Sequence, residues 1–250
     1  MPVLQPIIDR IARNETISRD EALAFASDPA LRADLFDTSA EATKRFASRI
    51  FNICGIVSIK TGACSCNCKW CAQSTHWTSS SIPIHPILPV SEVDAAAERA
   101  AAGGITRFSL VASGRKPSAR ETRMYAEHLK KLRSTNPKLE LCASLGLLNE
   151  KDLAVLKDAG LVRVHCNLET SERFFPQVCS SHTWEDKVKT IRAAKAAGLE
   201  VCSGGLFGMG ETAEDRIDLA FALRELEVPS IPLNLLDPRP GTPLEHAPKL

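Results

Sequence analysis

From residue 53 to its end, the chain alternates short apolar segments with longer amphipathic ones. The apolar segments have the length and composition of strands: residues 54–59, 106–112, 139–145, 162–168, 199–204 and 230–236. The amphipathic segments have helical spacing: residues 91–103, 118–133, 149–160, 183–198 and 211–227. Regular alternation of strand and helix favours a parallel sheet with helices packed outside it. The sequence therefore predicts an α/β fold built from repeated βα units.

Six such units can be counted, and a closed eight-unit barrel takes roughly 250 residues by itself. Here the first 50 residues precede the first strand, and the sequence ends at PGTPLEHAPKL, just after the sixth. Either the barrel is an open one of six units, or the chain is a fragment that lacks units seven and eight. We expect a TIM-type barrel of parallel βα units with six present and the last two absent.

Residues 1–50 are predicted to form a helical extension in front of a barrel core of residues 51–250. Ser18 followed by Glu21 is a capping box ahead of an apolar run. Ser39 is expected to open a second helix. Several later helices end at a glycine, which suits a left-handed carboxyl-terminal cap. These glycines are Gly103, Gly160 and Gly198.

Charge and hydropathy exclude several classes of function. The formal net charge is +1 with both signs evenly mixed, so we expect neither a nucleic-acid groove nor a membrane surface. No apolar run approaches the ~18 residues that span a bilayer. The first residues lack the pattern of a secretory signal. We therefore expect a cytoplasmic protein, in which nine cysteines favour metal or redox chemistry over disulfides.

Four of the nine cysteines fall within the segment Thr61–Cys71, directly after the first strand, in the pattern CxCxCxxC. A zinc site could use Cys66, Cys68 and Cys71 with a distant partner, but zinc sites usually combine two separated CxxC pairs. No second pair follows in this sequence. An iron–sulfur cluster with three protein thiolates leaves one iron open to another ligand. The spacing favours the cluster.

The CxxxCxxC subset, Cys64, Cys68 and Cys71, resembles the signature of radical S-adenosylmethionine (radical SAM) enzymes. The resemblance implies a 4Fe–4S cluster whose open iron binds the amino and carboxylate groups of S-adenosylmethionine. Trp70, before the last cysteine, fits the same pattern and is expected near the cofactor. Cys66 is then a bystander.

Further motifs resemble those of the biotin synthase family, in order, from about residue 40 to 245. They are SIKTGAC, CKWCAQS, TRFSLVASGRKPS, LCASLGLL, HCNLETS, VCSGGLFGMGET and PLNLLDPRPGTPL. The resemblance implies conversion of dethiobiotin to biotin. In that reaction, reductive cleavage of S-adenosylmethionine gives a 5′-deoxyadenosyl radical, which takes hydrogen from two substrate carbons, and an auxiliary iron–sulfur cluster donates the sulfur.

The resemblance also implies binding residues. Asn167 and Glu169 would contact cofactor and substrate, with strand-end capping as the alternative. Asn234 would meet the ureido ring of dethiobiotin. Lys187 would lie near the cofactor carboxylate, or be a solvated helix lysine. Gly205 and Gly208, in the glycine-rich stretch GLFGMGE, would line the adenosine.

The auxiliary cluster is where the sequence departs from the better-known members. Cys142 and Cys202 match two ligands of their 2Fe–2S cluster, but Ser109 stands at a third ligand position. Alternate strands of a barrel contribute to one interior layer, so Cys54 could join Cys142 and Cys202. We expect this trio to hold an auxiliary cluster that is not 2Fe–2S, as the resemblance suggests for one branch of the family.

Two further cysteines are weaker candidates for that site. Cys166 is a possible fourth ligand, although strand alternation points it away from the interior. Cys179 lies in a loop and could be only a free thiol. Burial in the apolar core is the alternative for every cysteine outside the CxxxCxxC motif.

The resemblance further implies a low-potential electron donor of flavodoxin or ferredoxin type, and a homodimer. The alternatives are a related radical SAM enzyme, such as a methylornithine synthase or a hydrogenase maturase, and a non-catalytic iron–sulfur electron carrier. An auxiliary cysteine set favours sulfur insertion over mutase chemistry.

Overall fold

The computed structural model describes residues 4–77 and 82–250. Its core is a five-stranded parallel sheet in the order β1-β2-β3-β4-β5. The strands are β1 (Cys54–Lys60), β2 (Arg107–Ala112), β3 (Glu140–Ser144), β4 (Arg163–His165) and β5 (Glu200–Cys202). A parallel pair, β6 (Gly205–Phe207) with β7 (Leu233–Leu235), continues it. The bridges Cys202↔Ser230 and Glu169↔Gly205 join the two sheets. The parallel α/β prediction is confirmed.

The fifth strand is broken, which the sequence pattern missed. Its halves are β5 and β6, separated at Ser203 and Gly204. A Cβ on Gly204 would lie 1.8 Å from the carbonyl oxygen of Pro232, so the backbones approach too closely there for any side chain. Counted as one strand, the two halves and β7 make the fifth and sixth of the six expected units.

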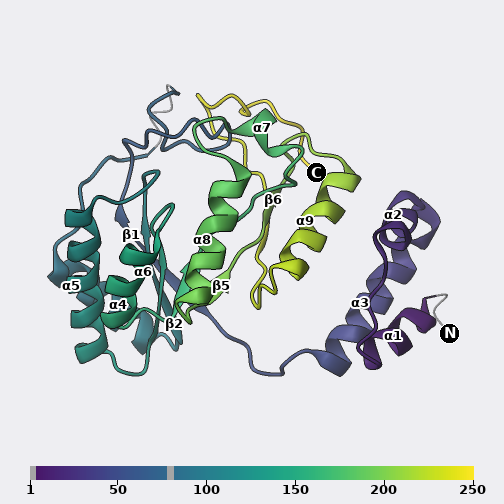
Figure 1. The fold of residues 1–250 in the computed structure, drawn as a ribbon, viewed down its shortest axis with the longest axis horizontal. Helices are drawn as coiled ribbons and strands as arrows, with labels where there is room; N and C mark the ends of the chain where they lie inside the picture. The colour runs from purple at the N-terminus through teal and green to yellow at the C-terminus, as the bar shows by residue number, and fades with distance from the viewer. Residues whose placement is uncertain (1–3, 78–81) are drawn as a thin grey trace.

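Helices cover the outer face of the strands (Figure 1). They are α4 (Val90–Ala102), α5 (Ala119–Thr135), α6 (Glu150–Asp158), α8 (Trp184–Ala196) and α9 (Ala213–Glu225), with the short α7 (Phe175–Val178) at one end. Strand residues of one parity, such as Phe108, Leu141 and Val201, are buried against these helices. Residues of the other parity face the inside of the curved sheet.

Three helices precede the strands: α1 (Gln5–Ala12), α2 (Arg19–Ser27) and α3 (Arg32–Phe46), with a 3₁₀ turn at Pro29–Leu31. They lie beside α9 (Figure 1), where Arg19 pairs with Asp218 at 2.6 Å. The capping box of Ser18 and Glu21 is confirmed. The prediction that Ser39 opens a helix is wrong, because its hydroxyl bonds to the carbonyl of Phe36 inside α3.

The expected left-handed caps are present at two of the three glycines. Gly160 and Gly198 have φ of 106° and 70°. Gly103 does not have a positive φ. The next residue, Gly104, takes the left-handed conformation after α4 instead, with φ 82°. No helix of residues 4–77 and 82–250 has the length and apolar character that crossing a bilayer requires.

Glu211 fixes the turn between β6 and α9. Its carboxylate accepts the N–H of Gly208 at 2.9 Å and that of Met209 at 2.8 Å, and pairs with Arg216 at 2.8 Å. The turn therefore depends on a carboxylate whose side chain is fully buried.

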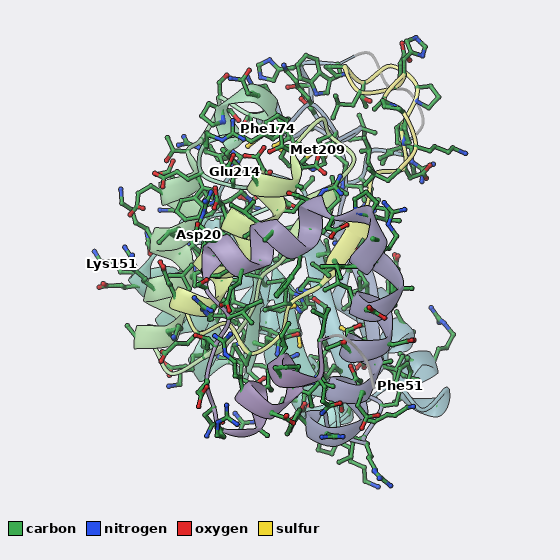
Figure 2. The ribbon with its side chains drawn as sticks, turned by 90° about the vertical axis from the view of Figure 1, so that its right-hand side faces the viewer. Asp20, Phe51, Lys151, Phe174, Met209 and Glu214 are labelled. Atoms are coloured by element: carbon green, nitrogen blue, oxygen red, sulfur yellow. The ribbon has the colours of Figure 1, made fainter. Side chains whose placement is uncertain are left out.

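We expect Glu211→Ala to lower the free energy of unfolding by about 2–3 kcal/mol, because it leaves two buried backbone N–H donors without their partner. Glu214→Ala is the matched control. That carboxylate, labelled in Figure 2, is 52% exposed and pairs with Arg19 at the surface, so its loss should cost at most about 1 kcal/mol. Urea denaturation of the two variants measures the difference, and equal losses would contradict this role for Glu211.

Candidate active site

A cavity of about 230 Å³ lies at the carboxyl ends of β1 to β4. The loop after β1 supplies one wall, the ends of β2, β3 and β4 supply others, and residues from the start of α8 complete it. In folds built from parallel βα units, the reactive groups gather at this end of the strands. The cavity is therefore the candidate active site.

The cysteine-rich loop folds tightly over this cavity. Gly62 and Ala63 adopt left-handed conformations with φ of 70° and 49°. A Cβ on Gly62 would lie 2.5 Å from Ile84, so glycine is required there. Cys64 bonds by its backbone to Gln73 and Thr75, which closes the loop. This turn directs the following cysteines back toward the strand ends.

Cys64, Cys68 and Cys71 all line the cavity, together with Trp70. Burial raises the pKa of the Cys71 thiol, so a bound cation would be needed to hold it as thiolate. Several soft thiol donors around one cavity fit an iron–sulfur cluster. Cys66 lines the same cavity, so position alone does not separate it from the other three.

Glu169 and Lys187 also line the cavity. The ammonium of Lys187 donates to the carbonyl of Asn167 at 2.8 Å. Burial raises the pKa of Glu169, although the Lys187 charge opposes the change. Burial alone would lower the pKa of Lys187, but nearby acidic groups, including Cys166 and Glu169, raise it. A charged lysine beside a carboxyl group can orient an ionic ligand.

Asn167 is held differently. Its side-chain oxygen accepts the N–H of Gly204 at 3.2 Å, which links β4 to the break in the fifth strand. Glu169 has a φ of 71° and bonds by its backbone to Gly204 and Leu206. These strand-to-strand contacts correspond to the capping alternative, and they place Glu169 at the cavity wall.

The structure does not bring Gly205, Gly208 or Asn234 into the cavity lining. A Cβ on Gly205 would lie 2.4 Å from Leu219, so packing against α9 already requires glycine there. Asn234 is exposed on β7, and its amide donates to the carbonyl of Gly205 at 3.5 Å. Their expected contacts with adenosine and dethiobiotin remain predictions.

A second group of cysteines lies on the inner face of the sheet. Cys54 on β1 and Cys142 on β3 lie close enough that each shifts the pKa of the other. Cys202 on β5 is buried, accepts from the Ser230 hydroxyl at 3.4 Å, and lies near enough to Cys54 for their charges to interact. The fold thus brings together the three cysteines expected to hold the auxiliary cluster.

Two arginines stand beside this trio. Arg107 is the cross-strand neighbour of Cys54, and Arg163 is that of Cys142. Arg107 pairs with Glu140 at 2.6 Å, and Arg163 pairs with Glu200 at 2.6 Å. The proximity of Cys142, helped by the two arginine charges, lowers the pKa of Cys54 to about 7, and the same proximity raises the pKa of Cys142. The pair therefore favours one thiolate, at Cys54, over two.

Two buried polar atoms nearby have no hydrogen-bond partner within residues 4–77 and 82–250: Nε2 of His165 and Oγ of Ser109. His165 lines the cavity and is the cross-strand neighbour of Cys202. Burial and the two arginine charges lower its pKa to about 4, so its ring is neutral at neutral pH. Ser109 is the neighbour of Cys142. Unpartnered buried polar atoms are costly unless a ligand satisfies them.

Cys166 does not join the trio. It belongs to the apolar core, and its thiol contacts the carbonyl of Lys187 at 3.9 Å. Its neighbours are Lys187 and Glu169. The parity that made it the weaker candidate is the physical reason, since β4 turns alternate side chains to opposite faces.

Arg107, Arg163 and His165 were not predicted from the sequence, although each shares its strand parity with an expected ligand position. It also left Cys179 as a free thiol and did not consider His182. The spacing Cys179-Ser-Ser-His182 is itself a possible ligand pair.

The sequence of the chain is similar to those of known proteins. Residues 58–223 match the model of the radical SAM superfamily. A biotin synthase of Porphyromonas gingivalis is 45% identical over 99% of this chain and 74% of its own length. A biotin synthase of a Sulfurihydrogenibium species is 42% identical over 98% of this chain and 73% of its own length.

Solved structures show the same fold at lower identity. A methylornithine synthase superposes with a TM-score of 0.84 at 18% identity, over 97% of this chain and 71% of its own. The FeFe-hydrogenase maturase HydG gives 0.82 at 18% identity, over 98% of this chain and 57% of its own. These two share the fold, whereas the biotin synthases share more than 40% of the residues as well. The chain belongs to the biotin synthase family of the radical SAM superfamily.

Proposed function

We propose that this chain converts dethiobiotin to biotin with two iron–sulfur clusters, one held by each cysteine group. The observation that carries the proposal is the presence of two separate thiol groups in one fold. One group lines the cavity at the strand ends, and the other lies on the inner face of the same sheet. A mutase or an electron carrier has no need of the second group.

Cys64, Cys68 and Cys71 are the proposed ligands of the 4Fe–4S cluster. When bound, the clusters supply the electron that cleaves S-adenosylmethionine and the sulfur that enters the product. The chain's own part is to bind, orient and exclude water. Lys187 and Glu169 place an ammonium group and a carboxyl group at the cavity wall, which suits the ionic groups of the cofactor, and Trp70 lines part of the cavity.

Cys54, Cys142 and Cys202 are the proposed auxiliary ligands. Arg107 and Arg163 offset the negative charge that several thiolates would concentrate on this inner face. The neutral ring of His165 lies at the cavity wall beside Cys202, with Nε2 free to bond to a polar group of the substrate.

The partners proposed are dethiobiotin and a low-potential electron carrier of flavodoxin or ferredoxin type, since the 4Fe–4S cluster must be reduced from outside. The homodimer also remains a prediction of the family resemblance, as does the division at residue 50. Nine cysteines without a disulfide suit the reducing cytoplasm, where we propose the protein acts.

The test is an anaerobic reaction of the reconstituted protein with S-adenosylmethionine, reductant and dethiobiotin. We expect biotin and 5′-deoxyadenosine to form together, and deoxyadenosine formation to fall sharply without dethiobiotin. Mass spectrometry detects both products. Deoxyadenosine formation that an amino acid stimulates, and dethiobiotin does not, would favour mutase chemistry instead.

A further inference from the structure

Three cysteines remain outside both proposed clusters, and two of them, Cys66 and Cys179, lie buried near Cys68, at 5% and 3% exposed. Cys179 follows α7, more than 100 residues beyond the cysteine-rich loop. Its thiol lies 3.6 Å from that of Cys68 and 3.4 Å from Nδ1 of His182. One ligand atom each from Cys68, Cys179 and His182 falls within 4.8 Å of the others. Three metal-binding side chains thus meet in one buried place.

Asn67 fastens the two loops that supply these side chains. Its side-chain oxygen accepts the N–H of Ser180 at 3.0 Å and of Ser181 at 2.9 Å. Its own N–H donates to the Ser181 hydroxyl at 3.1 Å. The N–H of Lys69 adds a bond to the carbonyl of Val178 at 2.9 Å. The approach of Cys179 to Cys68 is therefore fixed by backbone contacts on both sides of it.

The spacing of the donor atoms fits a tetrahedral ion. Zinc binds thiolate at about 2.3 Å and imidazole at about 2.0–2.1 Å, so two sulfurs on one ion stand about 3.8 Å apart, and sulfur and nitrogen about 3.5 Å. The corresponding separations here are 3.6 Å and 3.4 Å. The thiolates of a 4Fe–4S cluster bind different irons, so two sulfurs this close suit a single ion better.

Cys66 is a neighbour of these three side chains, two residues before Cys68, but it is not one of those whose ligand atoms lie within 4.8 Å of one another. The fourth position of a tetrahedral ion is therefore open to a water molecule. The ring of His182 is held in place by an edge contact with buried Phe175, at 5.5 Å between ring centres. The charge of Lys187 reaches Cys68 and Cys179 and would partly offset the negative charge of a two-thiolate site.

We propose that Cys68, Cys179 and His182 bind one thiophilic divalent cation, Zn²⁺ or its equivalent, when the 4Fe–4S cluster is absent. Binding forms two metal–sulfur bonds and one metal–nitrogen bond, and water takes the fourth position. The thiol protons go to solvent, and no group changes oxidation state. Because Cys68 is also a proposed cluster ligand, the ion and the cluster exclude each other; this part rests on the proposed function.

Cobalt titration of the cluster-free, reduced protein tests the site, because tetrahedral cobalt–thiolate centres absorb strongly in the visible. All samples carry Cys54→Ala and Cys142→Ala, which removes the competing inner group. We expect one Co²⁺ per chain, displaced by Zn²⁺. Cys179→Ala or His182→Ala should weaken binding about tenfold or more, whereas Cys71→Ala should leave it unchanged. Unchanged cobalt binding in Cys179→Ala would overturn the proposal.

Cluster loading separates this site from the proposed function. Cys179→Ala should still acquire the 4Fe–4S cluster, measured by iron and sulfide content and by electron paramagnetic resonance after reduction. Zinc added first should slow cluster loading in the parent but not in Cys179→Ala. If Cys179→Ala fails to load the cluster, Cys179 belongs to the cluster and the separate site is refuted. If the parent itself loads none, the ligand assignment of the proposed function fails, while the cobalt result stands independently.

Discussion

Replacing Cys64, Cys68 or Cys71 by alanine is expected to abolish reductive cleavage of S-adenosylmethionine. Each substitution removes one of only three thiolates on the proposed cluster, and an iron left without its protein ligand is lost easily. The measurement is the rate of 5′-deoxyadenosine formation by the anaerobically reconstituted variant, with the iron content of the same sample. We expect both to fall to background.

Cys66→Ala is the control within the same loop. Cys66 is as buried as Cys64 and lines the same cavity, so its replacement disturbs the packing of the loop to a comparable degree. If the CxxxCxxC spacing identifies the ligands, this variant keeps most of the cleavage activity. A Cys66→Ala protein as inactive as the other three would show that the ligand assignment is wrong.

The strand and helix order could be predicted because periodicity reports which face of an element is buried. Periodicity also predicted a site. Strand parity placed three cysteines on one inner face, and the fold brings them near one another: Cys54, Cys142 and Cys202. The same reasoning made Cys166 a weaker candidate for the auxiliary site, and Cys166 lies in the apolar core. Parity works for these residues because neighbouring parallel strands keep a regular register.

Contacts between loops cannot be predicted from periodicity. The approach of Cys179 and His182 to Cys68 depends on hydrogen bonds from Asn67 to a segment more than 100 residues away. No periodicity encodes that pairing. The break between β5 and β6 was missed for a similar reason, since it follows from the close approach of Pro232 to Gly204. Ser39 was misassigned because a hydroxyl can also bond within a helix.

Cys54→Ala is expected to separate cleavage of S-adenosylmethionine from formation of biotin. The variant should still cleave S-adenosylmethionine, because Cys54 is on the inner face of β1 and does not line the cavity that the cysteine-rich loop covers. It should form little or no biotin, because the proposed auxiliary cluster loses one of its three thiolates. Product analysis and Mössbauer spectra of the same anaerobic sample measure the two effects.

Ser109 gives the physical reason to expect this dependence on Cys54. It is the cross-strand neighbour of Cys142, where the 2Fe–2S site of better-known members would need a thiolate, and a hydroxyl is a poor ligand for such iron. Cys54 on β1 lies near Cys142 instead, and the proximity of Cys142 together with the charges of Arg163 and Arg107 lowers the pKa of Cys54 to about 7. The auxiliary cluster should therefore differ in type from 2Fe–2S.

Cys166→Ala is the control for Cys54→Ala, since it also removes one thiol outside the CxxxCxxC motif, here just beyond β4 at the cavity wall, but leaves the inner-face trio intact. Its auxiliary Mössbauer signal should equal that of the parent protein, while the signal of Cys54→Ala should be lost or changed in type. An auxiliary signal in Cys54→Ala that matches the parent would remove Cys54 from the site. The inner-face trio would then be a packing arrangement, and the sulfur source would have to lie elsewhere.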